Sequence, residues 1–256
     1  MYKSDFINEI HSRGFIHQAS DINSLDLLMK KNKIVGYIGF DPTNNDLHIG
    51  SLMQLMLLSW MEYFDHSPIL LMGGGTTLVG DPSGKDTTRK IMNIDQINNN
   101  IKDIKTSLSN FFDFNKDTII LNNHEWLSSQ NYIEFIRKVG SKITINKMLT
   151  YDSVKSRLER EQPLTFLEFN YMLLQAYDFL HLFENYSCVF QMGGSDQWGN
   201  IINGVELIKR HSNKQVFGLT TPLITLASGT KMGKTEKGAV WLDKKLLSTY
   251  DYWQFW

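Results

Sequence analysis

The sequence predicts an α/β fold in which helices flank a parallel sheet. Short apolar runs alternate along the chain with longer stretches of helical periodicity, the pattern of repeated strand–helix units. Several apolar runs end directly in glycine, at residues 39, 73–75 and 193–194. Because ligands of parallel sheets bind at the carboxyl ends of the strands, these glycines mark the expected position of a site.

Four apolar runs are short enough to be strands, and they comprise residues 33–40, 68–72, 118–121 and 186–192. Helical periodicity fills most of the sequence between them, over residues 51–64, 133–139, 165–184 and 199–211. Residues 141–160 mix polar, basic and apolar side chains without a strand pattern. We therefore expect a helical insertion at about 140–165, between the two halves of the sheet.

The composition is that of an ordinary globular protein, since 42 % of the 256 residues are hydrophobic and 21 % are charged. This length suits one large domain or a domain with an insert. A formal net charge of −1 excludes a basic character of the whole chain, so any contact with nucleic acid would use local patches. The single cysteine, Cys188, lies in an apolar run and predicts a buried thiol in a reducing compartment.

Neither targeting nor membrane signals are visible. Every apolar run is shorter than a membrane span and residues 1–10 are too polar for a secretory signal, so we expect a cytoplasmic protein without membrane contact. Residues 241–256 are rich in aromatic side chains up to Trp256. This segment either packs on its own domain or leads into a further domain that the chain does not contain.

The segment His48-Ile49-Gly50-Ser51 is a candidate phosphate site, because it follows an apolar run and opens a helical pattern. Unpaired backbone N–H groups and the helix dipole stabilise phosphate oxygens at the start of a helix. Gly50 lets a nucleotide lie against the backbone, and His48 could donate a hydrogen bond to a phosphate. The alternative is a turn histidine before an amphipathic helix that has Ser51 as its N-cap.

Two further segments resemble phosphate-binding loops. Lys231-Met232-Gly233-Lys234-Thr235 places two lysines in a glycine-rich stretch, which predicts a mobile cationic loop. Residues 80–85 (Gly-Asp-Pro-Ser-Gly-Lys) fail the P-loop pattern, because Val79 and Asp86 stand where glycine and Ser or Thr are required. We interpret that segment either as a turn that presents Asp81 or as a solvated loop.

Polar residues within two apolar segments suggest a pocket. Tyr171, Gln175 and Asp178 lie at i, i+4 and i+7 of a predicted helix and share one face, which either is solvated or lines a site for a small polar ligand. Residues 191–200 leave a strand through paired glycines, and Asp196 could accept from ribose hydroxyls or could cap the next helix. No Cys/His spacing typical of zinc occurs.

Taken together, these segments resemble the catalytic domain of class I aminoacyl-tRNA synthetases, and specifically the bacterial-type tyrosyl-tRNA synthetases. The resemblance begins at Tyr37-Ile38-Gly39-Phe40-Asp41-Pro42-Thr43 and His48-Ile49-Gly50, and continues through residues 80–85, 168–178, 191–200 and 231–235. It implies a Rossmann-like fold that activates L-tyrosine with ATP to tyrosyl-adenylate and transfers the tyrosyl group to the 3′ end of tRNA(Tyr).

The resemblance also implies roles for individual residues. Tyr37 and Asp178 would hydrogen-bond the phenol of the substrate, and its ammonium group would be held by Asp81, Tyr171 and Gln175. The remaining residue implied at the tyrosine site is Gln191. The residues implied at the ATP site are Gly39, Asp41, His48, Gly50, Ser51, Gly194, Asp196, Gln197, Leu223, Ile224 and Lys234, with Leu223 and Ile224 beside the adenine.

Catalysis would rest on positioning and charge stabilisation, because the reaction needs no covalent enzyme intermediate. The resemblance implies that Thr43 and His48 contact the phosphates from one side, while Lys231, Lys234 and Thr235 close over them from the other. Lys85 and Arg89 would handle the end of the tRNA. No metal ligands are implied, and Mg²⁺ would arrive with ATP.

The sequence departs from the family's motifs at two positions, and two alternative functions stay open. Ser51 stands where the class signature has a second histidine, and Gly233 stands where serine is commoner. A tryptophanyl enzyme is the near rival, and a non-catalytic RNA-binding relative is the distant one. We expect a catalytic domain at 1–240, the start of a linker to an absent anticodon-binding domain at 241–256, and a homodimer through residues 140–149.

Overall fold

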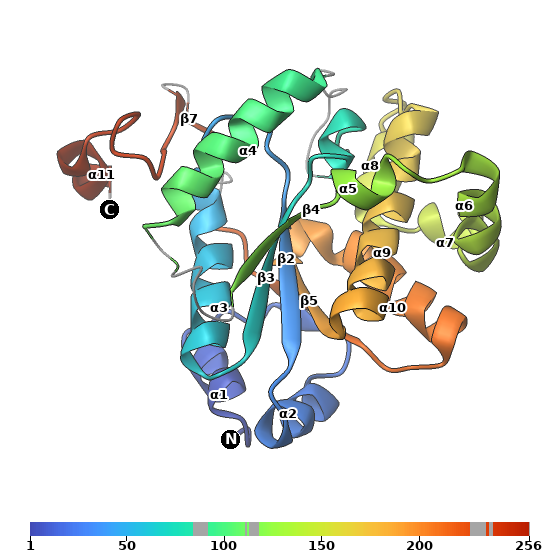
Figure 1. Cartoon of the computed structure of the whole chain (residues 1–256), viewed down its shortest axis with the longest axis horizontal. Coiled ribbons are helices and arrows are strands. Elements are labelled where there is room, and N and C mark those ends of the chain that lie inside the picture. The colour runs from blue at the N-terminus through green and yellow to red at the C-terminus, as the bar shows by residue number, and fades with distance from the viewer. Residues whose placement is uncertain (84–91, 111, 113–117, 226–233, 236–237, 256) are drawn as a thin grey trace.

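A six-stranded sheet between two layers of helices forms the body of the described chain in this computed structural model (Figure 1). The structure describes residues 1–83, 92–110, 112, 118–225, 234–235 and 238–255. The strands are β1 (Gln18–Ala19), β2 (Val35–Phe40), β3 (Ser67–Met72), β4 (Ile119–Asn122), β5 (Cys188–Gly194) and β6 (Phe217–Thr221), with β7 (Lys234–Thr235) and β8 (Gly238–Ala239) in a separate pair.

The α-helices are α1 (Asp5–Ser12), α2 (Ile22–Lys31), α3 (Leu52–Tyr63), α4 (Ile94–Leu108), α5 (His124–Leu127), α6 (Tyr132–Lys138), α7 (Ile145–Met148), α8 (Asp152–Glu159), α9 (Phe166–Tyr186), α10 (Trp198–Ser212) and α11 (Thr249–Phe255). Short 3₁₀ turns are η1 (Ile49–Ser51), η2 (Thr76–Leu78), η3 (Gly140–Lys142) and η4 (Ser195–Gln197). The four helices predicted at 51–64, 133–139, 165–184 and 199–211 correspond to α3, α6, α9 and α10.

The topology of the sheet creates a binding crevice. The strand order is β1-β6-β5-β2-β3-β4, so the direction in which the chain adds strands reverses at β2. Strands β2 to β6 pair in parallel, and the two-residue β1 runs antiparallel beside β6. Ligands bind at such a switch point, outside the carboxyl ends of the two strands that flank it. The predicted parallel α/β sheet flanked by helices is confirmed.

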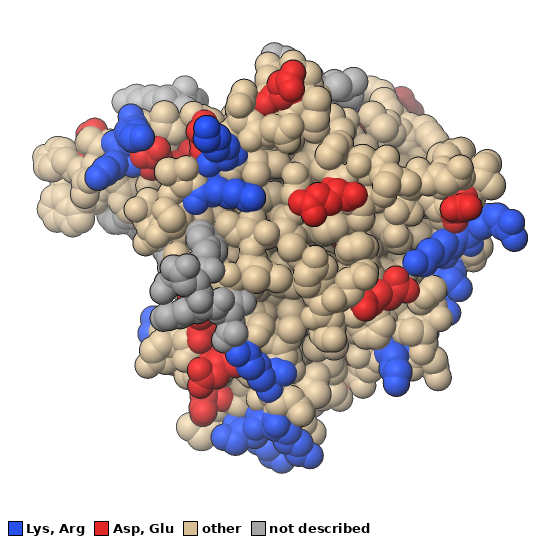
Figure 2. Space-filling model, viewed as in Figure 1, with Lys and Arg blue, Asp and Glu red and all other residues tan. Residues whose placement is uncertain are grey.

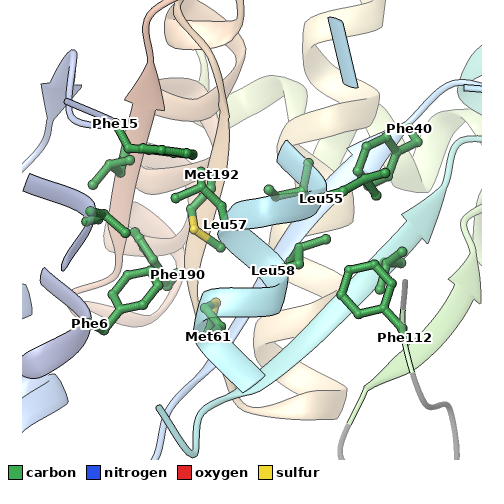
Figure 3. Packing of buried hydrophobic residues seen from close by; sticks show 14 of the residues in the cluster. Phe6, Phe15, Phe40, Leu55, Leu57, Leu58, Met61, Phe112, Phe190 and Met192 are labelled. Carbon is green, nitrogen blue, oxygen red and sulfur yellow. The ribbon is translucent and has the colours of Figure 1, made fainter. Parts of the chain in front are cut away.

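Two hydrophobic cores lie on opposite faces of the sheet, and alternate residues of β2 and β3 belong to one or the other. Ile38 and Phe40 of β2 belong to the larger core, beneath α1, α2, α3 and α4. Figure 3 shows how side chains from α1, α3 and β5 pack together there. Tyr37 of β2 belongs to the second core, beneath α9 and α10. Figure 1 shows α3 and α4 on one side of the sheet and α9 and α10 on the other.

The helical insertion predicted at about 140–165 consists of η3, α7 and α8, and further short helices, α5 and α6, precede it. Met148 and Val154 of the insertion pack on Met172 of α9 in a small third core. Tyr151 lies against α10, where its hydroxyl donates to Asn203 Oδ1 at 2.8 Å. A Cβ at Gly199 would lie 2.8 Å from the Tyr151 ring, so a glycine is needed at this contact.

The two-residue strands β1, β7 and β8 were not predicted, and two larger differences concern β5 and β6. The run predicted at 186–192 forms β5 at 188–194, because Gly193 and Gly194 continue the ladder and pair with Thr220 and Thr221 of β6. Strand β6 was not among the predicted strands. Its sequence, Phe-Gly-Leu-Thr-Thr, lacks an apolar run, although all five of its residues are buried.

The distribution of surface charge agrees with a net charge near zero, and the single cysteine is buried. Figure 2 shows acidic and basic side chains in small separate groups over one face, with wide uncharged areas between them. Within the described ranges, we find no helix with the combined length and apolar character that crossing a membrane requires. Cys188 is free and buried, as predicted, and burial raises the pKa of its thiol to about 12.

The segment after β8 is joined to the start of α3. Trp241 forms a β-bridge with His48, and the N–H of Leu242 donates to the carbonyl of Leu47 at 3.0 Å. The side chain of Asp46 accepts a hydrogen bond from the N–H of Asp243 at 2.7 Å. Residues 241–243 are therefore attached to the body of the domain, while the domain boundary at 240 stays a prediction.

The longest helix begins at a capping box that is reinforced by a buried ion pair. The side chain of Thr165 accepts from the N–H of Glu168, and Glu168 accepts in return from the N–H of Thr165. Arg157 of α8 donates to Glu168 Oε1 at 3.2 Å and to the carbonyl of Pro163, and both charged side chains are 2 % exposed. Breaking such a pair would leave an uncompensated buried charge.

Replacing Arg157 by alanine is expected to lower the free energy of unfolding by about 3–5 kcal/mol, the usual cost of removing one partner of a buried pair. The matched control is Lys155→Ala on the same helix, because the Lys155–Glu159 pair is exposed and should contribute less than about 1 kcal/mol. Urea unfolding followed by circular dichroism measures both. Equal losses for the two variants would contradict this account.

Candidate active site

A cavity of about 440 Å³ opens at the carboxyl ends of β2 and β5. It lies at the switch point of the sheet, where the glycine-terminated strands predicted a site. Residues from both halves of the sheet, from α9 and from the start of α3 line it. The sequence-predicted residues among its walls are Tyr37, Gly39, Asp41, Thr43, His48, Gly50, Ser51, Asp81, Tyr171, Gln175, Asp178, Gln191, Gly194, Asp196, Gln197 and Leu223.

Six predicted residues are not placed in this wall. Ile224 is half-buried beside Leu223 in the chain, but it does not line the cavity. Lys85, Arg89 and Lys231 lie outside the described residues. Lys234 and Thr235 form β7, which pairs antiparallel with β8, and the structure describes only their backbone.

The inner end of the cavity is formed by buried polar groups on the sheet. Tyr37 of β2 and Gln191 of β5 are register partners and are 1 % and 2 % exposed. The Tyr37 hydroxyl and Gln191 Oε1 have no hydrogen-bond partner among the described residues. Burial, together with the charge of Asp178, raises the pKa of Tyr37 well above its ordinary value, so its hydroxyl keeps its proton. Orphaned buried polar atoms are costly, which indicates that a polar ligand completes this end.

Asp178 closes the same end from α9. Its Oδ2 accepts from Asn123 Nδ2 and its Oδ1 accepts from Trp126 Nε1, both at 2.8 Å. Burial raises the pKa of Asp178 to about 7. The hydrogen bonds from Asn123 and Trp126 lower this pKa, and the charge of Asp41 raises it further. The alternative of a solvated helix face at 171–178 is wrong, because Asp178 is 2 % exposed and Tyr171 is 6 % exposed.

Sequence analysis did not single out Asn123 and Trp126, the two residues that donate hydrogen bonds to Asp178. Asn123 follows β4 directly, and its Oδ1 accepts from the N–H of Gly75 at 2.8 Å while its Nδ2 also donates to Thr76. The one available signal was the polar residue at the carboxyl end of the strand predicted at 118–121. A position beside Asp178 follows only from the packing of β4 and α5 against α9.

A second polar chain links the middle of the cavity to α9. The Tyr171 hydroxyl donates to Asp41 Oδ2 at 2.9 Å, and Thr76 donates to Asp41 Oδ1 at 2.8 Å. Burial and the neighbouring carboxylates Asp41 and Asp81 raise the pKa of Tyr171 well above its ordinary value. Asp41, implied at the ATP site, thus holds a tyrosine-site residue in place. A Cβ at Gly73 would lie 2.0 Å from Asp41 Oδ1, so glycine is required there.

Asp81 is presented by a turn, as one of the two interpretations expected. Gly80 has a φ of +88°, a conformation that favours glycine, and the N–H of Ser83 donates to Asp81 Oδ1 at 2.9 Å. Gln197 Nε2 donates to Asp81 Oδ2 at 2.7 Å, and Asn200 donates to Gln197. Over the described part of this segment, residues 80–83, the solvated-loop alternative is wrong, because these residues are buried and Asp81 is only 9 % exposed.

The outer end contains the start of α3. His48 Nδ1 accepts from the N–H of Gly50 at 3.0 Å, so a neutral His48 ring carries its proton on Nε2 as a donor. Ser51 stands at the N-cap position of α3, as the alternative interpretation of this segment expected, but its side chain makes no capping bond to the helix. The equivalent alternative for Asp196 is wrong, because Asp196 lies inside η4 and the residue before α10 is Gln197.

The described walls carry negative charge. Four carboxylates line the cavity, on Asp41, Asp81, Asp178 and Asp196, whereas no lysine or arginine occurs among the lining residues that the structure describes. Such walls attract an ammonium group. The charge of a triphosphate would have to be balanced by helix N–H groups, by His48 and by cations supplied from elsewhere.

Comparisons with known proteins agree with this geometry. Residues 29–256 match the family model of the "tRNA synthetases class I (W and Y)". The chain belongs to this family. It is 60 % identical over 255 residues to the tyrosine–tRNA ligase of Pelagibacter ubique, covering 98 % of this chain and 62 % of that relative. It is 55 % identical to the enzyme of the same name from Xanthobacter autotrophicus, covering 100 % of this chain and 61 % of that relative. The chain therefore spans less than two thirds of the length of these relatives.

The solved structures that resemble this chain include tyrosyl- and tryptophanyl-tRNA synthetases. A C-terminally truncated mitochondrial tyrosyl-tRNA synthetase from Aspergillus nidulans superposes with a TM-score of 0.86 at 30 % identity, over 98 % of this chain and 75 % of that chain. The tryptophanyl-tRNA synthetase of Aeropyrum pernix superposes with a TM-score of 0.68 at 16 % identity, over 91 % of this chain and 60 % of that chain. The second likeness concerns the fold alone, so it does not decide between the two amino acids.

The pKa of Asp178 predicts an unusual pH dependence of stability. Because the folded-state pKa is about 7 and the ordinary value is 3.8, the unfolded chain releases this proton first as the pH rises. Relative to Asp178→Asn, the wild type should lose stability between pH 4 and pH 7, by about 1.4 kcal/mol per pH unit, and then level off. Urea unfolding of both proteins from pH 4 to pH 8 measures the difference.

Asp21→Asn is the control for this series. Asp21 caps α2, and its hydrogen bonds with Ser24 lower its pKa, so its contribution is constant above pH 5 and is lost only in acid. The asparagine in Asp178→Asn places an N–H₂ group against Asn123 or Trp126, but that penalty is the same at every pH. A stability difference for Asp178→Asn that does not change between pH 4 and pH 7 would refute the raised pKa.

Proposed function

We propose that this chain activates L-tyrosine with ATP, forming tyrosyl-adenylate and pyrophosphate, and that the whole protein transfers the tyrosyl group to the 3′ end of tRNA(Tyr). The observation that carries this proposal is the inner end of the cavity, where the buried Tyr37 hydroxyl lacks a partner among the described residues beside the carboxylate of Asp178. A phenolic hydroxyl of the substrate can donate to Asp178 and accept from Tyr37, which satisfies both groups.

The same groups supply selectivity. Phenylalanine would fill the apolar part of the pocket but would leave Tyr37 and Asp178 without their partner, at the full desolvation cost of buried polar atoms. Tryptophan carries one N–H donor and no acceptor, so it could serve Asp178 but could not accept from Tyr37. The arrangement therefore favours tyrosine over the tryptophan that other members of the family use.

The amino acid's ammonium group has a place further out. Asp81, Tyr171 and Gln175 line the same cavity, and Asp81 lies near enough to Tyr171 for its charge to raise the pKa of that hydroxyl. Asp81 supplies negative charge, and Tyr171 is fixed by its hydrogen bond to Asp41. An ammonium held there would direct the substrate carboxylate toward the outer part of the cavity, where the nucleotide would lie.

The nucleotide would bind across the ends of β2 and β5. A Cβ added to Gly39 would meet no atom within 4 Å, so the backbone there is open to a close approach. At Gly194 a Cβ would lie 2.8 Å from Asp196 Oδ1 and 3.0 Å from Leu223, so the space beside this strand end does not admit a side chain at residue 194. His48 and the N-terminus of α3 would then face the phosphates.

The reaction follows from this placement. A carboxylate oxygen of tyrosine attacks the α-phosphorus of ATP, an O–P bond forms, and the bond from that phosphorus to the bridging oxygen breaks to release pyrophosphate. The chain's residues orient the reactants and stabilise charge. The roles of Thr43, Lys85, Arg89, Lys231, Lys234 and Thr235 in these steps stay predictions from sequence. Mg²⁺ would enter with ATP; within the described ranges, no group of three or more His, Cys, Asp or Glu side chains could hold a metal ion.

The non-catalytic RNA-binding alternative has less support. Such a relative would have no need of the polar pair at the inner end, and the sequence retains His48, Lys231 and Lys234. Cytoplasmic location stays a prediction from sequence.

Exchange of labelled pyrophosphate into ATP tests the proposal. We expect exchange that depends on tyrosine and is far weaker with phenylalanine or tryptophan. Tyr37→Phe should raise the KM for tyrosine about two- to tenfold, since a hydrogen bond of this kind contributes about 0.5–1.5 kcal/mol, and should narrow the preference for tyrosine over phenylalanine. The KM for ATP should not change.

The control separates chemistry from folding. Lys234→Ala should retain the folded structure, judged by circular dichroism, and lose exchange with every amino acid. Tyrosine-independent binding of RNA by a folded wild type that exchanges nothing would instead favour the non-catalytic alternative. Exchange that prefers tryptophan would refute the tyrosine assignment.

We also propose that the protein is a homodimer through residues 140–149 and the helix that precedes them. Ile145 of α7 is 63 % exposed and Leu149 is 40 % exposed, while Ile133 and Ile136 of α6 are 63 % and 41 % exposed. Figure 1 shows α6 and α7 together at one edge of the molecule. Exposed apolar side chains gathered in this way are typical of protein–protein contacts.

Replacing Ile145 by aspartate is expected to give a monomer at concentrations where the wild type is a dimer, because a charge in an apolar interface is desolvated without a partner. Leu27→Asp is the matched control, since Leu27 of α2 is 42 % exposed and lies away from α6 and α7. Light scattering coupled to gel filtration measures the mass. Monomeric wild type, or a dimer that survives Ile145→Asp, would exclude this interface.

A further inference from the structure

The ring of His181 stacks on Trp126, outside the cavity. The ring centroids are 4.2 Å apart and the planes are inclined by 14°, a face-to-face arrangement. His181 is three residues after Asp178 on α9, so the two side chains lie on neighbouring positions of one helix face. Trp126 bridges them, because its N–H donates to Asp178 while its ring contacts His181.

The indole of Trp126 is held by its hydrogen bond to Asp178 and by packing in the second core, and the face-to-face contact with His181 is part of that packing. Trp126 lies on α5, a helix of only four residues beyond the end of the sheet. An indole has a single N–H donor, so a rotation of the ring removes the whole hydrogen bond to Asp178 Oδ1. Asn123, the other donor to Asp178, is fixed independently by Gly75 and Thr76. Trp126 has no comparable polar anchor among the described residues.

We propose that His181 is a positioning residue for tyrosine recognition: its ring holds the plane of Trp126 so that the indole N–H stays directed at Asp178. This inference rests on the proposed function, since Asp178 is the group that would receive the substrate phenol. His181 contacts neither substrate nor reacting atoms, and it acts through Trp126.

The surroundings of His181 favour a neutral ring. Burial lowers its pKa, the charge of Glu184 raises it, and Lys138 of α6 lowers it. The ring centroids of Tyr177 and Tyr186 each lie 6.4 Å from the centroid of the His181 ring. The amide of Asn185 lies 3.4 Å from His181 Nδ1. A neutral ring acts on Trp126 through its flat face, so an uncharged aromatic ring should replace it.

The test compares His181→Ala with His181→Phe. The indole N–H signals of the six tryptophans are recorded by ¹⁵N–¹H NMR, and Trp126→Phe identifies the signal of Trp126. His181→Ala should shift or broaden that signal and raise the KM for tyrosine about two- to tenfold, the range that corresponds to the coupling of an aromatic pair. The KM for ATP should stay constant, and His181→Phe should restore both readouts.

His211→Ala is the matched control. His211 of α10 pairs with Glu184 at 2.9 Å and so belongs to the same charged surroundings, but its ring does not stack on Trp126. It should leave the Trp126 signal and the KM for tyrosine unchanged. An equal effect of His211→Ala would show that charge rather than stacking controls the site, and would overturn the proposal.

Two other outcomes would also overturn it. One is a Trp126 signal that does not move in His181→Ala, and the other is a signal that moves while tyrosine affinity stays the same. Titration of tyrosine followed on the Trp126 signal measures this affinity without ATP. A wild type that binds tyrosine but exchanges no pyrophosphate would sink the activation proposal alone, since the titration still decides the role of His181.

Discussion

The burial of the Asp178 carboxylate is the constraint on which the rest of the site depends. A carboxylate at 2 % exposure is unfavourable unless donors surround it, and the chain supplies Asn123 from the end of β4 and Trp126 from α5. Those donors do not fully offset the desolvation, since the pKa remains about 7. A substrate hydroxyl would add a further donor, so the cost of burial becomes a preference for a ligand that carries one.

The charge of the cavity divides it into two parts. The described walls carry four carboxylates and no lysine or arginine, which suits an amino acid's ammonium group but opposes a triphosphate. Helix N–H groups at the start of α3 and the lysines of residues 231–235 are the complementary parts in the proposed function. Trp241 and Leu242, which follow β8, pair with His48 and Leu47, so the chain returns to the start of α3 after those lysines.

Two of the contacts that hold the insertion to α9 and α10 also concern the site. Arg157 and Glu168 fix the start of α9, the helix that carries Tyr171 and Asp178. Tyr151 packs against Gly199 at the start of α10, close in sequence to Asp196 and Gln197. The helices α6 and α7, which expose Ile133 and Ile145, join the same layer of α9 and α10 through the Phe135–Tyr177 ring pair and the Lys147–Glu206 ion pair. Formation of the proposed dimer would bury part of that layer rather than a separate appendage.

The order of motifs shared with a known family named more than half of the residues that line the cavity. Local sequence determined the α/β class, four of the strands and the principal helices, because periodicity and glycines at strand ends depend on residues close in the chain. It missed β6, because Thr220 and Thr221 are polar in sequence and are buried only by their neighbours. Asn123 and Trp126 were likewise missed, and so was the role of Asp41 in holding Tyr171. These partners are 52 to 130 residues apart, so only the tertiary packing of β4, α5 and β2 against α9 could bring them together.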